Sequence, residues 1–208
     1  MKVLLFNGSP RQKGCTNAAL EEITKVLNQE GIESEIFYAG TEPIVPCKAC
    51  GACVKLGRCV INDKVNEFVE KAKEADGIIL GSPVHYASAS GIAALFLDRA
   101  FYAGSKQGVF RHKPGAAIVS ARRAGTTATL DQLNKYFMIN EMPVISSRYW
   151  NMVHGNTPEE IKEDKEGMQI MQILAKNMAW LLKCQQAAKD AGIQAPEKEE
   201  VQRTNFIR

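Results

Sequence analysis

The chain has 208 residues, of which 45% are hydrophobic and 24% charged, a composition typical of one soluble globular domain. Its formal net charge is +3 with basic and acidic residues interspersed, so it has no basic stripe that would favour nucleic acid as a partner. No segment approaches the roughly twenty apolar residues that a membrane span requires. We therefore expect a cytoplasmic protein without a membrane span, in a compartment where thiols stay reduced and disulfides are rare.

Short apolar runs alternate with segments of helical periodicity. Lys2–Phe6 is an apolar run that stops at Asn7-Gly8, which is too short for a signal peptide and predicts a buried strand. The segment 16–30 has apolar residues at helical spacing and ends at Gly31. Further strands are predicted at 33–38, 77–82, 115–120 and 143–146, and further helices after Asp63, at 90–102 and at 126–137. Five such units predict a doubly wound α/β fold with a parallel sheet covered by helices on both faces.

The C-terminal part is predicted to be one long helix. Thr157 is followed by proline and then by Glu160, a pattern typical of a capped helix start, and Gly192 marks the end. A methionine-rich stripe on the helix, expected at about 158–191, indicates core packing rather than a cofactor site. We expect one domain over residues 1–195, with a cysteine-rich loop at 46–60 inserted into it, and a charged tail at 196–208.

The loop after the first strand has the composition of a phosphate site. In "NGSPRQKGCTN", Ser9 and Thr16 offer hydroxyls, Asn17 an amide and Arg11 a positive charge, at the start of a predicted helix. The loop lacks the closing Gly-Lys-Ser/Thr of a nucleoside triphosphate loop and the G-x-G-x-x-G of a dinucleotide site, which favours a monophosphate cofactor. The alternative is that glycine, serine and proline merely form a turn here.

Two later loops are expected at the same edge of the sheet, where doubly wound folds bind ligands. After the third strand, in "SPVHYASASG", His85 and Tyr86 offer flat side chains that could lie along a ring system. After the fourth strand, in "SARRAG", Arg122 and Arg123 could compensate negative charge on a reduced ring. Three loops that converge on one crevice are stronger evidence for a ligand than any one of them.

The most distinctive motif is a group of four cysteines spaced C-x2-C-x2-C-x5-C. They are Cys47, Cys50, Cys53 and Cys59. Zinc usually takes two separated C-x2-C pairs, whereas three cysteines at steps of three favour an iron-sulfur cluster, with a 4Fe-4S cluster held by this segment alone. The small residues between them leave room for cluster sulfides. A reduced loop without metal remains the alternative.

Two motifs give the sequence a specific resemblance. "GSPRQKGCTN" and "SPVHYASASGIAALFLDR" are similar to the NADPH-dependent FMN reductase family of the flavodoxin-like superfamily, and the cysteine run resembles its iron-sulfur flavoprotein branch. The likeness extends from residue 1 to about residue 147. It implies a flavodoxin-like five-stranded sheet in the order 2-1-3-4-5, bound FMN, and a homodimer or homotetramer. The cofactor-binding residues that it implies are Ser9, Arg11, Thr16 and Asn17 around the phosphate, Pro83, Val84, His85 and Tyr86 beside the ring, and Ser120, Ala121 and Arg122 on its far side.

The resemblance implies an oxidoreductase that passes electrons from NAD(P)H through FMN to an acceptor such as a quinone or flavin, with the cluster as a possible intermediate. No side chain is expected to act as nucleophile or general base, because the cofactor supplies the chemistry. One alternative is a non-enzymatic electron carrier between redox proteins. Another is a thiol-based metal or redox sensor that carries no flavin.

Overall fold

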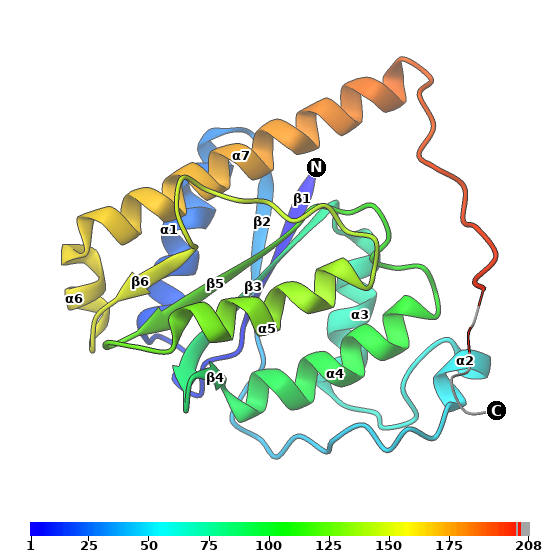
Figure 1. Ribbon diagram of the computed structural model, residues 1–208, viewed down its shortest axis with the longest axis horizontal. Helices are drawn as coiled ribbons and strands as arrows, with labels where there is room; N and C mark the ends of the chain where they lie inside the picture. The colour runs from blue at the N-terminus through cyan, green and yellow to red at the C-terminus, as the bar shows by residue number, and fades with distance from the viewer. Residues whose placement is uncertain (203, 205–208) are drawn as a thin grey trace.

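The computed structural model describes residues 1–202 and 204 and has an α/β fold built on one sheet (Figure 1). The elements are β1 (Lys2–Asn7), α1 (Cys15–Gln29), β2 (Glu33–Tyr38), α2 (Ala52–Leu56), α3 (Lys64–Glu74), β3 (Gly77–His85), β4 (Ser88–Ala89), α4 (Gly91–Ser105), β5 (Gly115–Ala121), α5 (Thr126–Met138), β6 (Met152–His154), α6 (Pro158–Glu163) and α7 (Lys165–Asp190). The strand order is β2-β1-β3-β5-β6, with β4 antiparallel to β3. The five parallel strands thus follow the predicted order 2-1-3-4-5.

Both faces of the sheet are covered by helices, with α3, α4 and α5 on one face and α1 and α7 on the other (Figure 1). The apolar side chains of β1 contribute to the hydrophobic core on both faces of the sheet. Leu4 and Phe6 lie in the core beneath the first group, and Val3 and Leu5 in the core beneath the second. Successive side chains of a strand point to opposite faces, so a strand covered on both sides reads as a continuous apolar run.

The position predicted for the fifth parallel strand is wrong. Residues 143–146 make only an isolated parallel bridge, between Val144 and Gly115, and the strand that continues the sheet is β6. Ile145 donates its N–H to the Gly115 carbonyl at 2.8 Å, and the chain then leaves the sheet before β6 pairs with Val119 to Ala121. The apolar run that was expected to be the strand therefore lies only against the start of β5.

The long C-terminal helix is interrupted at Asp164, which separates α6 from α7. The ψ of Asp164 is 76°, outside the helical region, and its carboxylate accepts hydrogen bonds from the N–H groups of Gly167 at 2.9 Å and His154 at 2.7 Å. Asp164 is therefore the N-cap of α7, and the cap starts a new helix where a continuous one was expected.

Residues 196–202 have no regular secondary structure, and residues 203 and 205–208 of the expected tail lie outside the described residues. Within the part of the chain that the structure describes, no helix is long and apolar enough to cross a membrane.

Candidate functional site

The first two loops meet at the edge of the sheet where the parallel strands end. Asn7 of β1 is level with Gly81 of β3, and the Gly8 N–H donates to the Gly81 carbonyl at 2.9 Å. The Ser90 hydroxyl, at the start of α4, donates to the Gly8 carbonyl at 2.6 Å. A Cβ at Gly8 would lie 2.6 Å from the Cβ of Ala93, so only glycine allows this approach of the loop to α4.

Asn7 organises the loop between β1 and α1. Its side-chain amide donates to the Gln12 carbonyl at 3.0 Å and to Asn17 Oδ1 at 3.2 Å, while its Oδ1 accepts the Ser9 N–H at 3.0 Å. The Ser9 hydroxyl in turn accepts the Arg11 N–H at 3.1 Å. Asn7 was not predicted to organise this loop, although an asparagine at a strand end before glycine is a recognised turn signal.

The N-terminus of α1 leaves its first backbone N–H groups without a side-chain cap. Gly14 holds the N-cap position and supplies no side-chain hydrogen bond. The buried hydroxyl of Thr16, in the first turn, lies 2.8 Å from the buried hydroxyl of Ser120 at the end of β5. The first and third loops are therefore joined, and orphan helix N–H groups of this kind are suited to an anion.

Cys15 is the first residue of α1, and its thiol donates a hydrogen bond to the Gly155 carbonyl, with Sγ and O 3.7 Å apart. Burial raises the pKa of the Cys15 thiol. A thiol that is held protonated in this way packs against the chain rather than reacting.

The second loop is a tight hairpin between β3 and β4. Its two turn residues, Tyr86 and Ala87, both have positive φ, 51° and 57°. Left-handed backbone costs a non-glycine residue on the order of 1–3 kcal/mol and persists only where neighbours enforce it. Here Gln132 of α5 accepts hydrogen bonds from the Ser88 hydroxyl and the Ala89 N–H, both at 2.8 Å.

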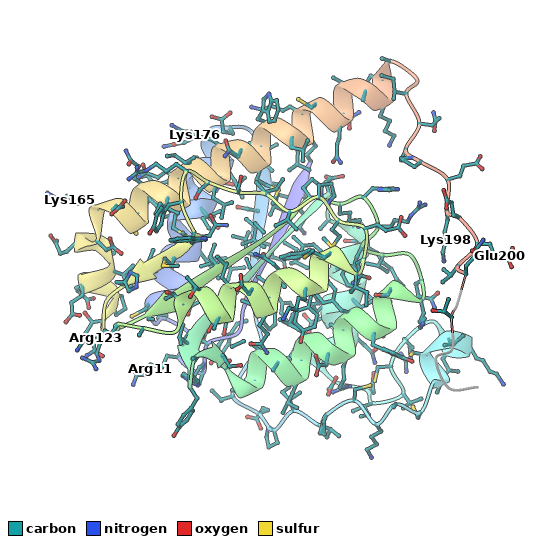
Figure 2. All side chains as sticks on the ribbon, in the orientation of Figure 1. Arg11, Arg123, Lys165, Lys176, Lys198 and Glu200 are labelled. Atoms are coloured by element: carbon teal, nitrogen blue, oxygen red, sulfur yellow. The ribbon has the colours of Figure 1, made fainter. Side chains whose placement is uncertain are left out.

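The third loop packs against this hairpin. Gly125 has φ +91°, and a Cβ there would lie 2.8 Å from the Cα of Ala87. Arg123 of this loop and Arg11 of the first loop extend outward at the same end of the molecule (Figure 2). The three loops are therefore in contact, and Arg11 and Arg123 project from them (Figure 2).

The residues predicted to bind the cofactor lie in these three loops or in the adjoining ends of α1, β3 and β5, at different depths. Ser9, Thr16, Ser120 and Ala121 are buried; Asn17, Pro83 and Val84 are half-buried; Arg11, His85, Tyr86 and Arg122 are exposed.

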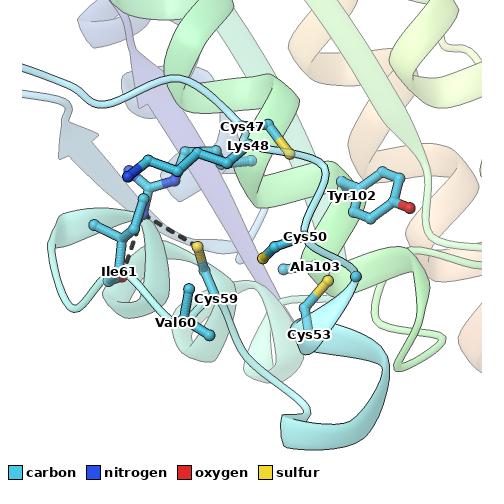
Figure 3. Close-up of a pocket in the computed structure, with 11 residues that line it drawn as sticks. Cys47, Lys48, Cys50, Cys53, Cys59, Val60, Ile61, Tyr102 and Ala103 are labelled. Carbon is cyan, nitrogen blue, oxygen red and sulfur yellow. Dashed lines mark hydrogen bonds between the residues drawn. The ribbon is translucent and has the colours of Figure 1, made fainter.

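The cysteine segment follows β2 and lies near the far end of α4 (Figure 1). Its four cysteines line one pocket, together with Arg99, Tyr102 and Ala103 of α4, and Figure 3 shows the four side chains around the same space. Left-handed backbone at Ala49, Gly51 and Gly57 folds the segment around this pocket, with α2 as a single short helix. The expected cysteine-rich loop is therefore folded around a pocket that it shares with α4.

The thiols of this pocket differ in exposure. Cys53 is buried, Cys59 is half-buried, and Cys47 and Cys50 are exposed. Burial, followed by the charges of the neighbouring cysteines, raises the pKa of Cys53. Within residues 1–202 and 204, no three His, Cys, Asp or Glu side chains are gathered in a metal-binding arrangement. The cysteines share a pocket, but their sulfurs are not drawn together to ligand distance.

Two polar residues that were not predicted as site residues, Asn66 and Arg99, hold this segment. The buried Asn66 side chain of α3 accepts the Cys59 N–H at 2.9 Å and donates to the carbonyls of Cys59 and Ile61, both at 3.0 Å. Arg99 of α4 is also buried and forms an ion pair with Asp63. A charged residue on the apolar face of a predicted helix was the available signal for Arg99.

Residues 1–157 match the family model described as NADPH-dependent FMN reductase. The chain belongs to the NADPH-dependent FMN reductase family. Within this family it is similar to an iron-sulfur flavoprotein of Methanocaldococcus jannaschii, with 33% identity over 88% of this chain and 98% of that protein. It is also 30% identical to an iron-sulfur flavoprotein of Methanosarcina thermophila, over 91% of this chain and all of that protein (100%).

The fold of this FMN reductase family member is flavodoxin-like. An archaeal flavodoxin structure superimposes with a TM-score of 0.61 and 16% identity, over 88% of this chain and 99% of that one. The predicted family and fold are thus confirmed. The family also indicates a flavin cofactor, and the uncapped start of α1 beside the buried hydroxyls of Ser9 and Thr16 suits the phosphate of such a group. The individual residue roles and the cluster remain predictions.

Proposed function

We propose that the protein is an FMN-dependent oxidoreductase that takes electrons from NADH or NADPH and passes them to a small acceptor such as a quinone or free flavin. The observation that carries the proposal is the contact of three loops at the carboxyl edge of the sheet, through Ser90–Gly8, Thr16–Ser120 and Gly125–Ala87. The chemistry that FMN supplies when bound is hydride uptake from NAD(P)H and release of electrons singly or in pairs.

The loop between β1 and α1 would hold the phosphate. Ser9 and Thr16 would donate hydroxyl hydrogens, Asn17 an amide hydrogen and Arg11 a charge, beside the uncapped start of α1. The network around Asn7 already fixes Ser9 and Asn17 without a ligand. A preformed loop of this kind loses little conformational entropy when the anion binds.

The other two loops would hold the ring. Pro83, Val84, His85 and Tyr86 would lie beside it, with Tyr86 presented on the strained hairpin tip. On the far side, Ser120 and Ala121 would bring backbone close to the ring. Arg122 would lower the energy of a negatively charged reduced flavin, because an exposed cation stabilises nearby negative charge.

We further propose that Cys47, Cys50, Cys53 and Cys59 hold a 4Fe-4S cluster, whose chemistry when bound is one-electron transfer. The common pocket and the compact fold of the segment support the proposal. The separate sulfurs of the ligand-free segment would have to move together when the cluster binds. Lys48 and Lys55 in the same segment would offset the repulsion among four thiolates.

We also propose that the protein is a homo-oligomer and that it is located in the cytoplasm. The exposed side chains of Trp150 and Trp180 support an oligomer, because aromatic residues are enriched in protein–protein interfaces. The six free thiols favour a reducing compartment.

Anaerobic purification separates the candidate functions. FMN, iron and acid-labile sulfide are measured per chain, and the oxidation of NADH and NADPH is followed with a quinone or free flavin as acceptor. We expect one FMN per chain and turnover. Cofactor without turnover with any acceptor would favour the non-enzymatic carrier, and metal without flavin would favour the sensor. Cys50→Ser should remove iron while it leaves FMN bound.

A further inference from the structure

Arg99 is a buried arginine that the flavin chemistry does not use. Its side chain is only 1% exposed, and it lies on α4, nine residues after Ser90, which caps that helix beside the first loop. A rise of about 1.5 Å per residue puts roughly 13 Å of helix between them. Arg99 therefore belongs to the cysteine pocket rather than to the loops at the other end of α4.

The hydrogen-bond acceptors of the Arg99 guanidinium lie within the cysteine-rich loop at 46–60 or within three residues of its ends. Two bonds go to the Asp63 carboxylate, at 2.6 and 3.0 Å. Others go to the carbonyl of Val45 at 3.3 Å, to the carbonyl of Ile61 at 3.2 Å and to Cys59 Sγ at 3.3 Å. The dashed lines in Figure 3 mark the bonds at Cys59 and Ile61. One side chain thus holds both ends of the segment that carries the four cysteines.

The partners of Arg99 also determine how much of its positive charge faces the cysteines. Asp63 neutralises the guanidinium in a two-point ion pair, yet one nitrogen of the guanidinium still faces the sulfur of Cys59. A hydrogen bond from a cationic donor to a cluster sulfur favours the form of the cluster with more negative charge. Lysine could not reproduce the arrangement, because only the planar guanidinium reaches several acceptors at fixed angles.

We infer that Arg99 is a positioning residue of the cysteine site, which fixes Cys59 as a ligand and raises the reduction potential of the cluster, with Asp63 as its counter-charge. The inference rests on the proposed 4Fe-4S site. It assigns a role to α4, whose first turn borders the flavin loops and whose second half lines the cysteine pocket.

The test compares Arg99→Gln, Asp63→Asn, the double variant and a matched control, Arg58→Gln. Arg58 is exposed and adjacent to Cys59 in the sequence, so its loss removes the same charge without the buried contacts. Full-length proteins are reconstituted anaerobically with iron and sulfide. FMN, iron and sulfide per chain are measured, and the cluster potential is determined by EPR-monitored redox titration.

We expect Arg99→Gln to shift the reduction equilibrium about tenfold towards the oxidised cluster, which is about 59 mV for one electron. Asp63→Asn should shift it in the opposite direction, because it leaves the guanidinium uncompensated. Arg58→Gln should stay close to wild type. Opposite signs for two members of one ion pair are not expected from a purely structural role.

If Arg99→Gln does not fold, the double variant takes its place in the test, because it removes both charges of the Arg99–Asp63 pair. The double variant should bind FMN normally and have a cluster reduction potential below that of wild type. If the variants at position 99 have the iron content and the cluster potential of wild type, the inference about Arg99 is overturned, while the proposal of a 4Fe-4S cluster still stands. Wild-type protein that binds FMN but no iron would overturn the cluster proposal and this inference together.

Discussion

The hydroxyls of Thr16 and Ser120 lie 2.8 Å apart and tie the first turn of α1 to the end of β5. Thr16→Val keeps the shape of the side chain but leaves the buried Ser120 hydroxyl without this partner. We expect a loss of about 1–3 kcal/mol in the free energy of unfolding, measured by urea titration. We also expect FMN affinity to fall on the order of tenfold, the equivalent of about 1.4 kcal/mol.

Thr127→Val is the matched control, because Thr127 is exposed on α5. Thr16→Ser should restore both properties, since the hydroxyl remains. Equal stability and FMN affinity in Thr16→Val and wild type would contradict the role of this contact.

Gly125→Ala tests the contact between the second and third loops. The new Cβ would lie 2.8 Å from Ala87 Cα in a backbone with φ +91°. We expect a stability loss of about 1–3 kcal/mol and weaker FMN binding, because both strain and displacement of the hairpin oppose the native arrangement. Gly192→Ala is the control, with φ +80° and nothing within 4 Å of its Cβ. Gly192→Ala shares the backbone strain but not the clash, so its FMN affinity should equal that of wild type. Equal FMN affinity in Gly125→Ala and Gly192→Ala would show that the contact between the loops is unimportant.

Asn66→Ala tests how the cysteine segment is held. The substitution removes three hydrogen bonds to the main chain of Cys59 and Ile61. We expect iron content after reconstitution to fall by half or more, and the unfolding free energy to fall by about 1–3 kcal/mol because partly buried main-chain groups lose their partners. Asn62→Ala, at an exposed position four residues earlier, should change neither. Full iron content in Asn66→Ala would argue that the segment needs no such support.

Glu35 gives the fold a defined acid sensitivity. Hydrogen bonds from Lys2 and then Lys71, both with N···O distances of 2.8 Å, lower the pKa of Glu35 from its ordinary 4.5. Because the folded pKa is the lower one, the stabilisation is complete well above pH 4.5 and is lost as pH falls through the folded value. Glu35→Gln should therefore be less stable than wild type near neutral pH, and the difference should shrink below pH 4.5.

Glu33→Gln is the control for this pH series, because Glu33 is more exposed and its carboxylate lies 3.8 Å from Lys2. Urea midpoints measured across the acid range test the prediction. A difference between Glu35→Gln and wild type that does not change with pH would contradict it.

The predictable parts of the fold are those in which burial leaves a pattern in the sequence. The runs at 2–6, 77–82 and 115–120 are apolar because helices cover both faces of their strands, and all three were recognised. The β6 strand was missed because its three residues are too few to show a pattern, while the neighbouring Val144 and Ile145 suggested a strand at 143–146 that only bridges to Gly115.

The candidate site likewise has parts that the sequence predicts and parts that it does not. The three loops were found because their positions follow from the strand order, and the cysteines because of their spacing. Asn7, Asn66 and Arg99 were missed as organisers because their partners include main-chain atoms of irregular segments. Such contacts depend on how the loops fold back on the helices and have no sequence periodicity.

Titration of flavin-free protein with FMN, with riboflavin as the matched ligand that lacks the phosphate, tests the central claim most directly. The account predicts one FMN per chain, quenched flavin fluorescence, and riboflavin binding at least tenfold weaker, a difference of about 1.4 kcal/mol or more. Failure to bind FMN, or equal affinity for the two ligands, would contradict a flavin site built around the loop between β1 and α1.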